Sequence, residues 1–118
     1  MDRKLLYRIN SLLKQIGFIE SDLDDILSEG LKPNTRLTRA TAFSIAQIGE
    51  QMTKLETLLK DEYPTIPWQS ARGMRNFIVH DYDSVDVEQL TLTVKQDLPE
   101  LKRAFLQIKE DIKTKKEA

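Results

Sequence analysis

One short stretch near the middle of the chain collects residues that could act on a phosphate group. A helix turns by about 100° per residue, so side chains spaced by three or four residues share a face. Within an arc of about 140° such a helix would carry Arg72, Arg75, Asn76 and His80. The opposite arc is apolar and holds Ala71, Met74, Phe77 and Ile78. The pattern predicts a helix that packs its apolar face and presents two guanidiniums, an amide and the chain's single histidine.

These residue types suit the cleavage of a phosphodiester bond. Arginine is always charged, its planar fork matches phosphate oxygens, and it can stabilise charge in a phosphorane-like transition state. His80 can give or take a proton near neutral pH. Asn76 can hold the histidine tautomer or bind phosphate, and Tyr82 can orient a phosphate oxygen or stack on a base. No metal or other cofactor is needed if the attacking group is the 2′-hydroxyl of RNA.

The chain has only one histidine, which limits how it could supply both proton transfers of such a reaction. Cleavage through the 2′-hydroxyl needs a base for the nucleophile and an acid for the leaving group. One chain supplies only His80. A twofold dimer would supply two copies of His80 and would also pair the arginines. The sequence therefore favours a composite cleft across a homodimer interface.

Each of these residues also has an ordinary structural interpretation. Arg72 and Arg75 could lie on a solvated helix face and pair with acidic neighbours at little energetic gain. Those neighbours are Asp81, Asp83 and Asp86. A histidine near a helix C-terminus often stabilises the helix dipole, and Tyr82 could pack to close a loop. The aspartates lack the glycine and distal glutamate of an EF-hand, so we reject a calcium loop. Residue types and spacing alone leave the function undecided.

Apolar stripes predict the helices that position this face. Apolar residues alternate spacings of four and three over residues 5–26, which is typical of one helix, and Gly30 is a good stop just beyond. A second stripe covers residues 37–59, with Asn34 or Thr35 as its cap. Two long stripes joined by a short turn predict an antiparallel helical hairpin.

Two shorter helices should follow the hairpin. The third should run over about 67–79, with Pro67 in its first turn. Asp86 can cap the fourth, and Pro99 should kink or restart that helix near Leu98. Since no segment shows convincing strand alternation, we expect an all-α, antiparallel four- to five-helix bundle.

Small and aromatic residues suggest where the helices meet. The second stripe carries Ala42, Ala46 and Gly49, which allow a neighbouring helix to approach closely. Trp68 precedes the apolar arc of the third helix by about one turn and should lie in the core. We therefore expect the third helix to pack on the hairpin.

Length and composition limit the remaining possibilities. The chain has 118 residues, which suits a single domain over 1–118. It carries 18 Lys+Arg and 19 Asp+Glu, so bulk charge does not favour nucleic acid and RNA binding would need a local site or a dimer. There is no cysteine, no apolar run that could span a bilayer and no signal-peptide pattern. We expect a cytoplasmic protein without membrane contact.

An ordered set of short motifs gives this sequence a family resemblance. In chain order the set is Y-P-x-I-P-W at 63–68, G-M-R-N at 73–76, V-H-D-Y at 79–82, V-D at 85–86 and D-L-P-E-L at 97–101. Within it, residues 75–82 read R-x-x-x-x-H-x-Y. The set resembles the signature of the HEPN superfamily, specifically its HepT-like toxin branch. The specific part of the match covers roughly residues 45 to 110.

The resemblance implies a homodimeric HEPN-like helical bundle with a metal-independent ribonuclease cleft. Carried over by position, Arg75 and His80 would be catalytic, with Asn76 as the polar residue after the motif arginine. The helical periodicity, rather than the resemblance, puts Arg72 on the same face as a supporting residue. The implied role is the toxin of a type II/VII-like toxin–antitoxin system that acts on RNA.

The resemblance also implies a partner and a modification. The cognate antitoxin would be a minimal nucleotidyltransferase that adds AMP to Tyr82. An adenylyl group beside Arg75 and His80 would fill the cleft and repel RNA. The alternative is a non-catalytic HEPN subunit that binds a nucleotide or docks the nucleotidyltransferase. A purely structural helical protein is a third, less favoured interpretation because the polar residues converge on one arc.

Overall fold

The computed structural model of this chain describes residues 2–77 and 85–117. Within these ranges all regular structure is helical, and the expected all-α helical bundle is confirmed. The predictions for Ile78, Val79, His80 and Tyr82 lie outside the described residues, as do those for Asp81 and Asp83.

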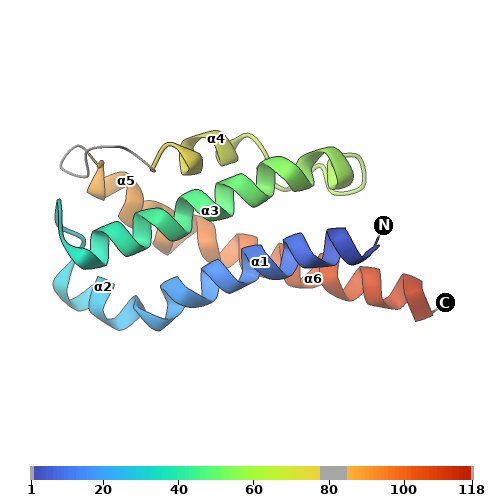
Figure 1. Ribbon diagram of the computed structural model, residues 1–118, viewed down its shortest axis with the longest axis horizontal. Helices are drawn as coiled ribbons and strands as arrows, with labels where there is room; N and C mark the ends of the chain where they lie inside the picture. The colour runs from blue at the N-terminus through green and yellow to red at the C-terminus, as the bar shows by residue number, and fades with distance from the viewer. Residues whose placement is uncertain (1, 78–84, 118) are drawn as a thin grey trace.

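The long predicted hairpin is present, but its first arm is divided (Figure 1). Instead of one helix over 5–26, α1 spans Asp2–Ser21 and α2 spans Leu23–Glu29. The break lies at Asp22, whose backbone N–H donates to the carbonyl of Ile19 at 3.0 Å, one residue closer than an α-helical bond. Beyond the break Ile26 is still buried, so the apolar stripe continues although the helix does not. Gly30 ends α2 with a φ of 77°.

The second arm begins where the sequence predicts. Helix α3 spans Arg36–Leu59, and Thr35 rather than Asn34 is its N-cap. The Thr35 hydroxyl accepts a hydrogen bond from the backbone N–H of Thr38 at 3.2 Å. Asn34 instead takes the left-handed conformation of the preceding turn, with a φ of 61°.

The bundle is closed by a long helical rod at the end of the chain. It consists of α5 (Val87–Leu92), the π-helical segment η2 (Thr93–Asp97) and α6 (Leu98–Glu117). The backbone N–H of Leu98 donates to the carbonyl of Thr93, which is the i→i+5 bond of a π-turn. Pro99 has no N–H and its ring conflicts with the carbonyl four residues earlier, so the wider turn accommodates it. The expected restart near Leu98 is therefore a change of helix type.

The core runs the length of the bundle, which measures 49 × 25 × 22 Å. Ile9, Leu12, Ile45, Met52 and Phe105 are fully buried at its centre. Trp68 lies in the core as predicted, edge-on to the ring of Phe105 with centroids 6.0 Å apart. The indole N–H of Trp68 also donates to the carbonyl of Tyr63 at 3.0 Å, which fixes the connection before the next helix. No helix among the described residues is long and apolar enough to cross a membrane.

Candidate active site

The short helix that carries the candidate residues is α4, Ser70–Arg75. It is shorter than predicted at its start, because Pro67 and Trp68 belong to a turn whose carbonyls accept from Ser70 and Ala71 at 3.0 and 3.1 Å. At its other end Phe77 continues as a turn, donating to the carbonyl of Met74 at 3.2 Å. The regular helix therefore ends at Arg75, and the predicted end at about residue 79 is wrong.

The two faces of α4 are divided as the sequence predicts. Ala71, Met74 and Phe77 are buried, whereas Arg72, Arg75 and Asn76 are exposed. The structure thus brings Arg72, Arg75 and Asn76 together on one surface of the bundle. His80 and Tyr82 follow this surface in the chain but lie outside the described residues.

A close contact between α3 and α4 determines the position of the Arg75 backbone. Helix α4 lies against α3 on the side away from α1 (Figure 1). A Cβ atom at Gly49 of α3 would lie 2.7 Å from the Ala71 carbonyl oxygen, 2.8 Å from the Met74 Cβ and 2.9 Å from the Arg75 backbone nitrogen. Any side chain larger than hydrogen would push α4 away. The prediction that Gly49 allows a neighbouring helix to approach closely is confirmed. That neighbouring helix is α4, which carries Arg75.

The residue after this glycine contacts the candidate arginine directly. Glu50 Oε2 lies 3.0 Å from Arg75 Nε. The two side chains are 40% and 48% exposed, so the pair is open to solvent and to an incoming anion. The acidic neighbours that we weighed as partners for Arg75 were the aspartates after the helix, and Glu50 was missed. Its position directly after Gly49 was the available signal.

Described residues flank the range 78–84 on both sides. Phe77 before it and Val85 after it are both buried. Asp86 then caps α5 as predicted, its Oδ1 accepting from the backbone N–H of Gln89 at 3.0 Å. The exposed end of α4 and the capped start of α5 therefore flank residues 78–84.

A polar groove lies on the flank of α4 that faces away from α3, between α4 and the α5–η2 rod. Its volume is about 330 Å³. The residues that line it include Gln69, Ser70, Gly73, Phe77, Gln89 and Asp97. Burial raises the pKa of the Asp97 carboxyl, and the nearby charge of Glu100 raises it further. With Thr93, which also lines it, the groove combines a carboxyl, two hydroxyls and two amides beside the arginine-bearing helix.

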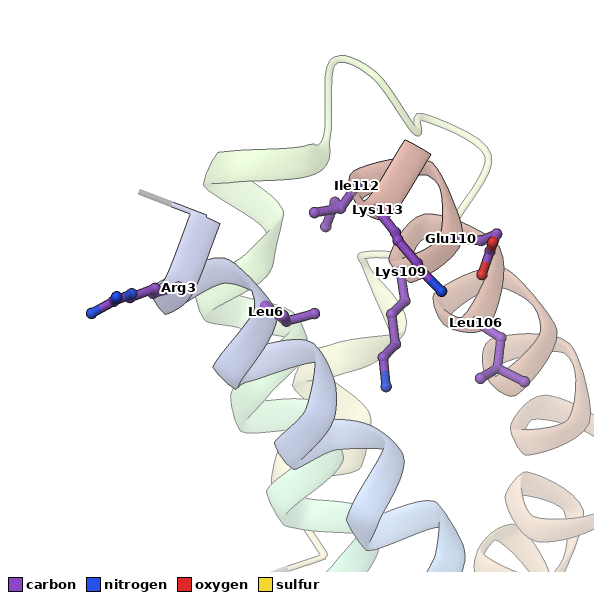
Figure 2. Close-up of a pocket in the computed structure, with 7 residues that line it drawn as sticks. All are labelled: Arg3, Leu6, Leu106, Lys109, Glu110, Ile112 and Lys113. Carbon is purple, nitrogen blue, oxygen red and sulfur yellow. The ribbon is translucent and has the colours of Figure 1, made fainter. Parts of the chain in front are cut away.

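A larger hollow lies elsewhere in the molecule. It has a volume of about 580 Å³ and lies between the start of α1 and the end of α6. Leu6 and Lys109 project into this gap, while Arg3 points away from it (Figure 2). No residue of α4 lines it, so it is separate from the candidate site. Across residues 2–77 and 85–117, no group of three or more His, Asp or Glu side chains is placed to hold a metal.

Comparison with known proteins places the chain in a family. The sequence profile described as "Ribonuclease HepT-like" matches residues 12–108. A protein of Methanocaldococcus jannaschii, named as a candidate RNase, is 30% identical over 113 residues, covering 96% of this chain and 95% of its own length. "Probable ribonuclease HepT" of Thermococcus cleftensis is 31% identical over 97 residues, covering 82% and 88%. No solved structure shows a significant match. The family resemblance drawn from the motifs is therefore confirmed, and the chain belongs to the HepT-like ribonuclease family.

Proposed function

We propose that this protein is a metal-independent endoribonuclease with Arg75 as phosphate clamp and His80 as general acid or base. The observation that carries the proposal is the exposed guanidinium of Arg75, set at the end of α4 by the contact at Gly49 and held by Glu50. Arg72 and Asn76 extend the same exposed face. Membership of a ribonuclease family supports RNA as the substrate.

The reaction is an internal transfer at phosphorus. A base removes the proton of the 2′-hydroxyl, and the resulting oxygen attacks the adjacent phosphorus. Arg75 stabilises the charge on the phosphorane-like transition state. An acid protonates the departing 5′-oxygen, so the products are a 2′,3′-cyclic phosphate and a free 5′-hydroxyl. No redox step or additional reactant is involved.

The two proton transfers motivate a homodimer. Because each chain has one histidine, His80 of a second copy would serve as the complementary acid or base. The test is a mixed dimer that carries His80→Ala on one subunit only. Strongly reduced cleavage is expected, and near-wild-type cleavage would rule out the two-histidine form of the mechanism.

Direct cleavage of RNA tests the central proposal. Purified wild-type protein should cut RNA in the presence of EDTA and leave 2′,3′-cyclic phosphate ends, detectable by mass spectrometry. Arg75→Ala and His80→Ala should each remove this activity, while Arg103→Ala, an exposed arginine of α6, should not. Equal cleavage by His80→Ala and wild type would sink the proposal.

The proposed biological role is that of a cytoplasmic toxin silenced by a nucleotidyltransferase antitoxin. The Tyr82 oxygen would attack the α-phosphorus of ATP in the antitoxin's active site and release pyrophosphate, leaving AMP on the tyrosine. Intact-mass analysis after co-expression with an adjacent nucleotidyltransferase gene product tests this step. A mass gain matching AMP that is absent in Tyr82→Phe is expected. An unchanged mass would leave direct binding as the mode of inhibition.

One observation favours a second candidate, the non-catalytic nucleotide-binding or docking subunit. Glu50 already pairs with Arg75 and offsets part of its attraction for phosphate. On this reading, the purified protein would bind the nucleotidyltransferase tightly and cut no RNA. The cleavage assay above separates the two functions.

A further inference from the structure

The polar groove beside α4 has the chemistry of a base-binding site. Its floor is apolar, since Met74 and Phe77 line it and are 3% and 8% exposed. Its rim carries the amides of Gln69 and Gln89, which can each donate and accept hydrogen bonds. A flat heterocycle with polar edges matches a hollow with an apolar floor and a hydrogen-bonding rim.

The charge of the groove argues against a phosphate in it. None of its described lining residues is a lysine or arginine, and one, Asp97, is a carboxylic acid. A phosphate would be repelled by that carboxylate and would find no cation. The amino group of a base would instead find an acceptor in Asp97, as carboxylates accept from cytosine N4.

The π-helical segment brings this acid to the groove. Asp97 is the last residue of η2, and it is partly buried. π-turns inserted in α-helices are frequent at functional sites because they redirect side chains without ending the helix. Here the turn precedes Pro99 and places a half-buried carboxyl in the groove that Gly73 also lines.

The groove lies on the flank of α4 next to Arg72, whereas Arg75 projects nearly opposite to Gly73, toward Glu50 of α3. Gly73 follows Arg72 by one residue, so it lies about 100° further round the helix. Arg72 is exposed beside the groove, which occupies the flank toward α5 and η2. A nucleotide beside this flank could therefore place its phosphate at Arg72 and its base in the groove.

We propose that the groove formed by Gln69, Gln89 and Asp97 around Gly73 binds a nucleobase, with preference for bases that carry an exocyclic amino group. Adenine, cytosine and guanine carry such a group, whereas uracil does not. The role of the groove in selecting cleavage sites rests on the proposed ribonuclease function. Binding of the base does not, and it can be measured on its own.

Gly73 provides a way to block the groove. A Cβ at this position would meet no atom within 4 Å, so Gly73→Leu can fill the groove without displacing the core. Gly17 of α1 has the same open surroundings, which makes Gly17→Leu a matched control. Titrations with AMP, CMP, GMP and UMP followed by NMR should show binding by wild type and Gly17→Leu, weakened about tenfold or more in Gly73→Leu. Equal binding by Gly73→Leu and wild type would overturn the proposal.

Asp97→Asn tests the base preference without filling the groove. Wild type should bind AMP, CMP and GMP at least about fivefold more tightly than UMP, and Asp97→Asn should reduce that ratio. Glu100→Gln, which removes a nearby exposed charge, should preserve it. A ratio near one in wild type, or one unchanged by Asp97→Asn, would contradict the assignment. Circular dichroism on every variant separates a blocked groove from a misfolded chain.

A second set of binding measurements distinguishes RNA from free nucleotides as the ligand of the groove. Homopolymeric 12-mer RNAs made resistant to cleavage by 2′-O-methylation should bind wild type with the same base order, and less tightly to Gly73→Leu. If mononucleotides are affected by Gly73→Leu but the oligomers are not, the groove serves a free nucleotide and the RNA assignment is wrong. If base binding holds but wild type cuts no RNA, the proposed ribonuclease function fails and the groove assignment stands.

Discussion

Arg75 and Glu50 meet across the interface of α3 and α4, with Nε 3.0 Å from Oε2. Both side chains are about half exposed, and exposed ion pairs contribute only about 0–1 kcal/mol. The pair therefore matters less for stability than for the direction in which the guanidinium points. Because Glu50 follows Gly49, one turn of α3 sets both the backbone and the side chain of Arg75.

Replacing Glu50 should strengthen RNA binding while barely changing stability. Glu50→Gln removes a negative charge next to Arg75, so the guanidinium becomes more available to phosphate. RNA affinity, measured by fluorescence anisotropy at low salt, should rise several-fold, and the free energy of unfolding should fall by less than about 1 kcal/mol. Glu56→Gln, which breaks an exposed pair with Lys60 at the C-cap of the same helix, is the control and should leave RNA binding unchanged. Weaker RNA binding by Glu50→Gln would show instead that the carboxylate orients Arg75 productively.

Enlarging Gly49 should displace the helix that carries the site. In Gly49→Ala the new methyl group would meet backbone atoms of Ala71 and Arg75 at less than 3 Å. Overpacking of this kind costs about 1–3 kcal/mol, and movement of Arg75 should also reduce RNA cleavage. In Gly17→Ala, where a Cβ meets nothing within 4 Å, stability should rise slightly from the gain in helix propensity. Urea unfolding and cleavage assays on both variants provide the measurement.

Hydrophobic periodicity correctly predicted which face of α4 is buried, because the two faces of this helix differ sharply in polarity. Ala71, Met74 and Phe77 are buried and Arg75 is exposed, as a helix of 3.6 residues per turn requires. The boundaries were less accurate. The division at Asp22 was missed because the apolar stripe continues through it to the buried Ile26.

Contacts between distant residues could not be read from the sequence. Glu50 and Arg75 are separated along the chain, and only the packing at Gly49 brings them together. Asp97 was assigned only as part of a motif at the start of the last helix. Its position in the groove depends on the π-turn before Pro99, which no hydrophobic pattern marks.

The contact of Tyr63 with Asp111 should make stability depend on pH in acid. The Tyr63 hydroxyl donates to Asp111 Oδ2 at 2.7 Å, and this bond is the main reason that the pKa of Asp111 is lowered, with Gln107 adding to it. A lowered carboxyl pKa contributes stability above the ordinary value of about 4, and that stability is lost as the pH falls through the lowered pKa. Wild type should therefore have the higher Tm at pH 7, and its advantage over Tyr63→Phe should shrink below about pH 4. A constant difference in Tm from pH 7 to pH 2.5 would contradict this account.

The same tyrosine should show the opposite dependence in alkali. Burial raises the pKa of the Tyr63 hydroxyl, and the bond to Asp111 raises it further. A raised pKa contributes stability that is present below the ordinary tyrosine value of about 10 and is lost as the pH rises through the raised pKa. Thermal unfolding above about pH 10 should thus bring wild type and Tyr63→Phe together again. Separation of the two curves with rising pH would exclude this linkage.

Removing the cap of α5 should affect stability and activity together. Asp86→Ala leaves the backbone N–H of Gln89 without its side-chain acceptor and should cost about 0.5–2 kcal/mol. Thr35→Ala removes the corresponding cap of α3 and should cost a similar amount. Asp86 lies two residues after the segment that carries His80 and Tyr82, whereas Thr35 precedes a different helix, so only Asp86→Ala should reduce RNA cleavage beyond its effect on the folded fraction. Cleavage rates measured well below both transition temperatures make the comparison, and an equal loss in the two variants would mean that the α5 cap has no special part in positioning the motif.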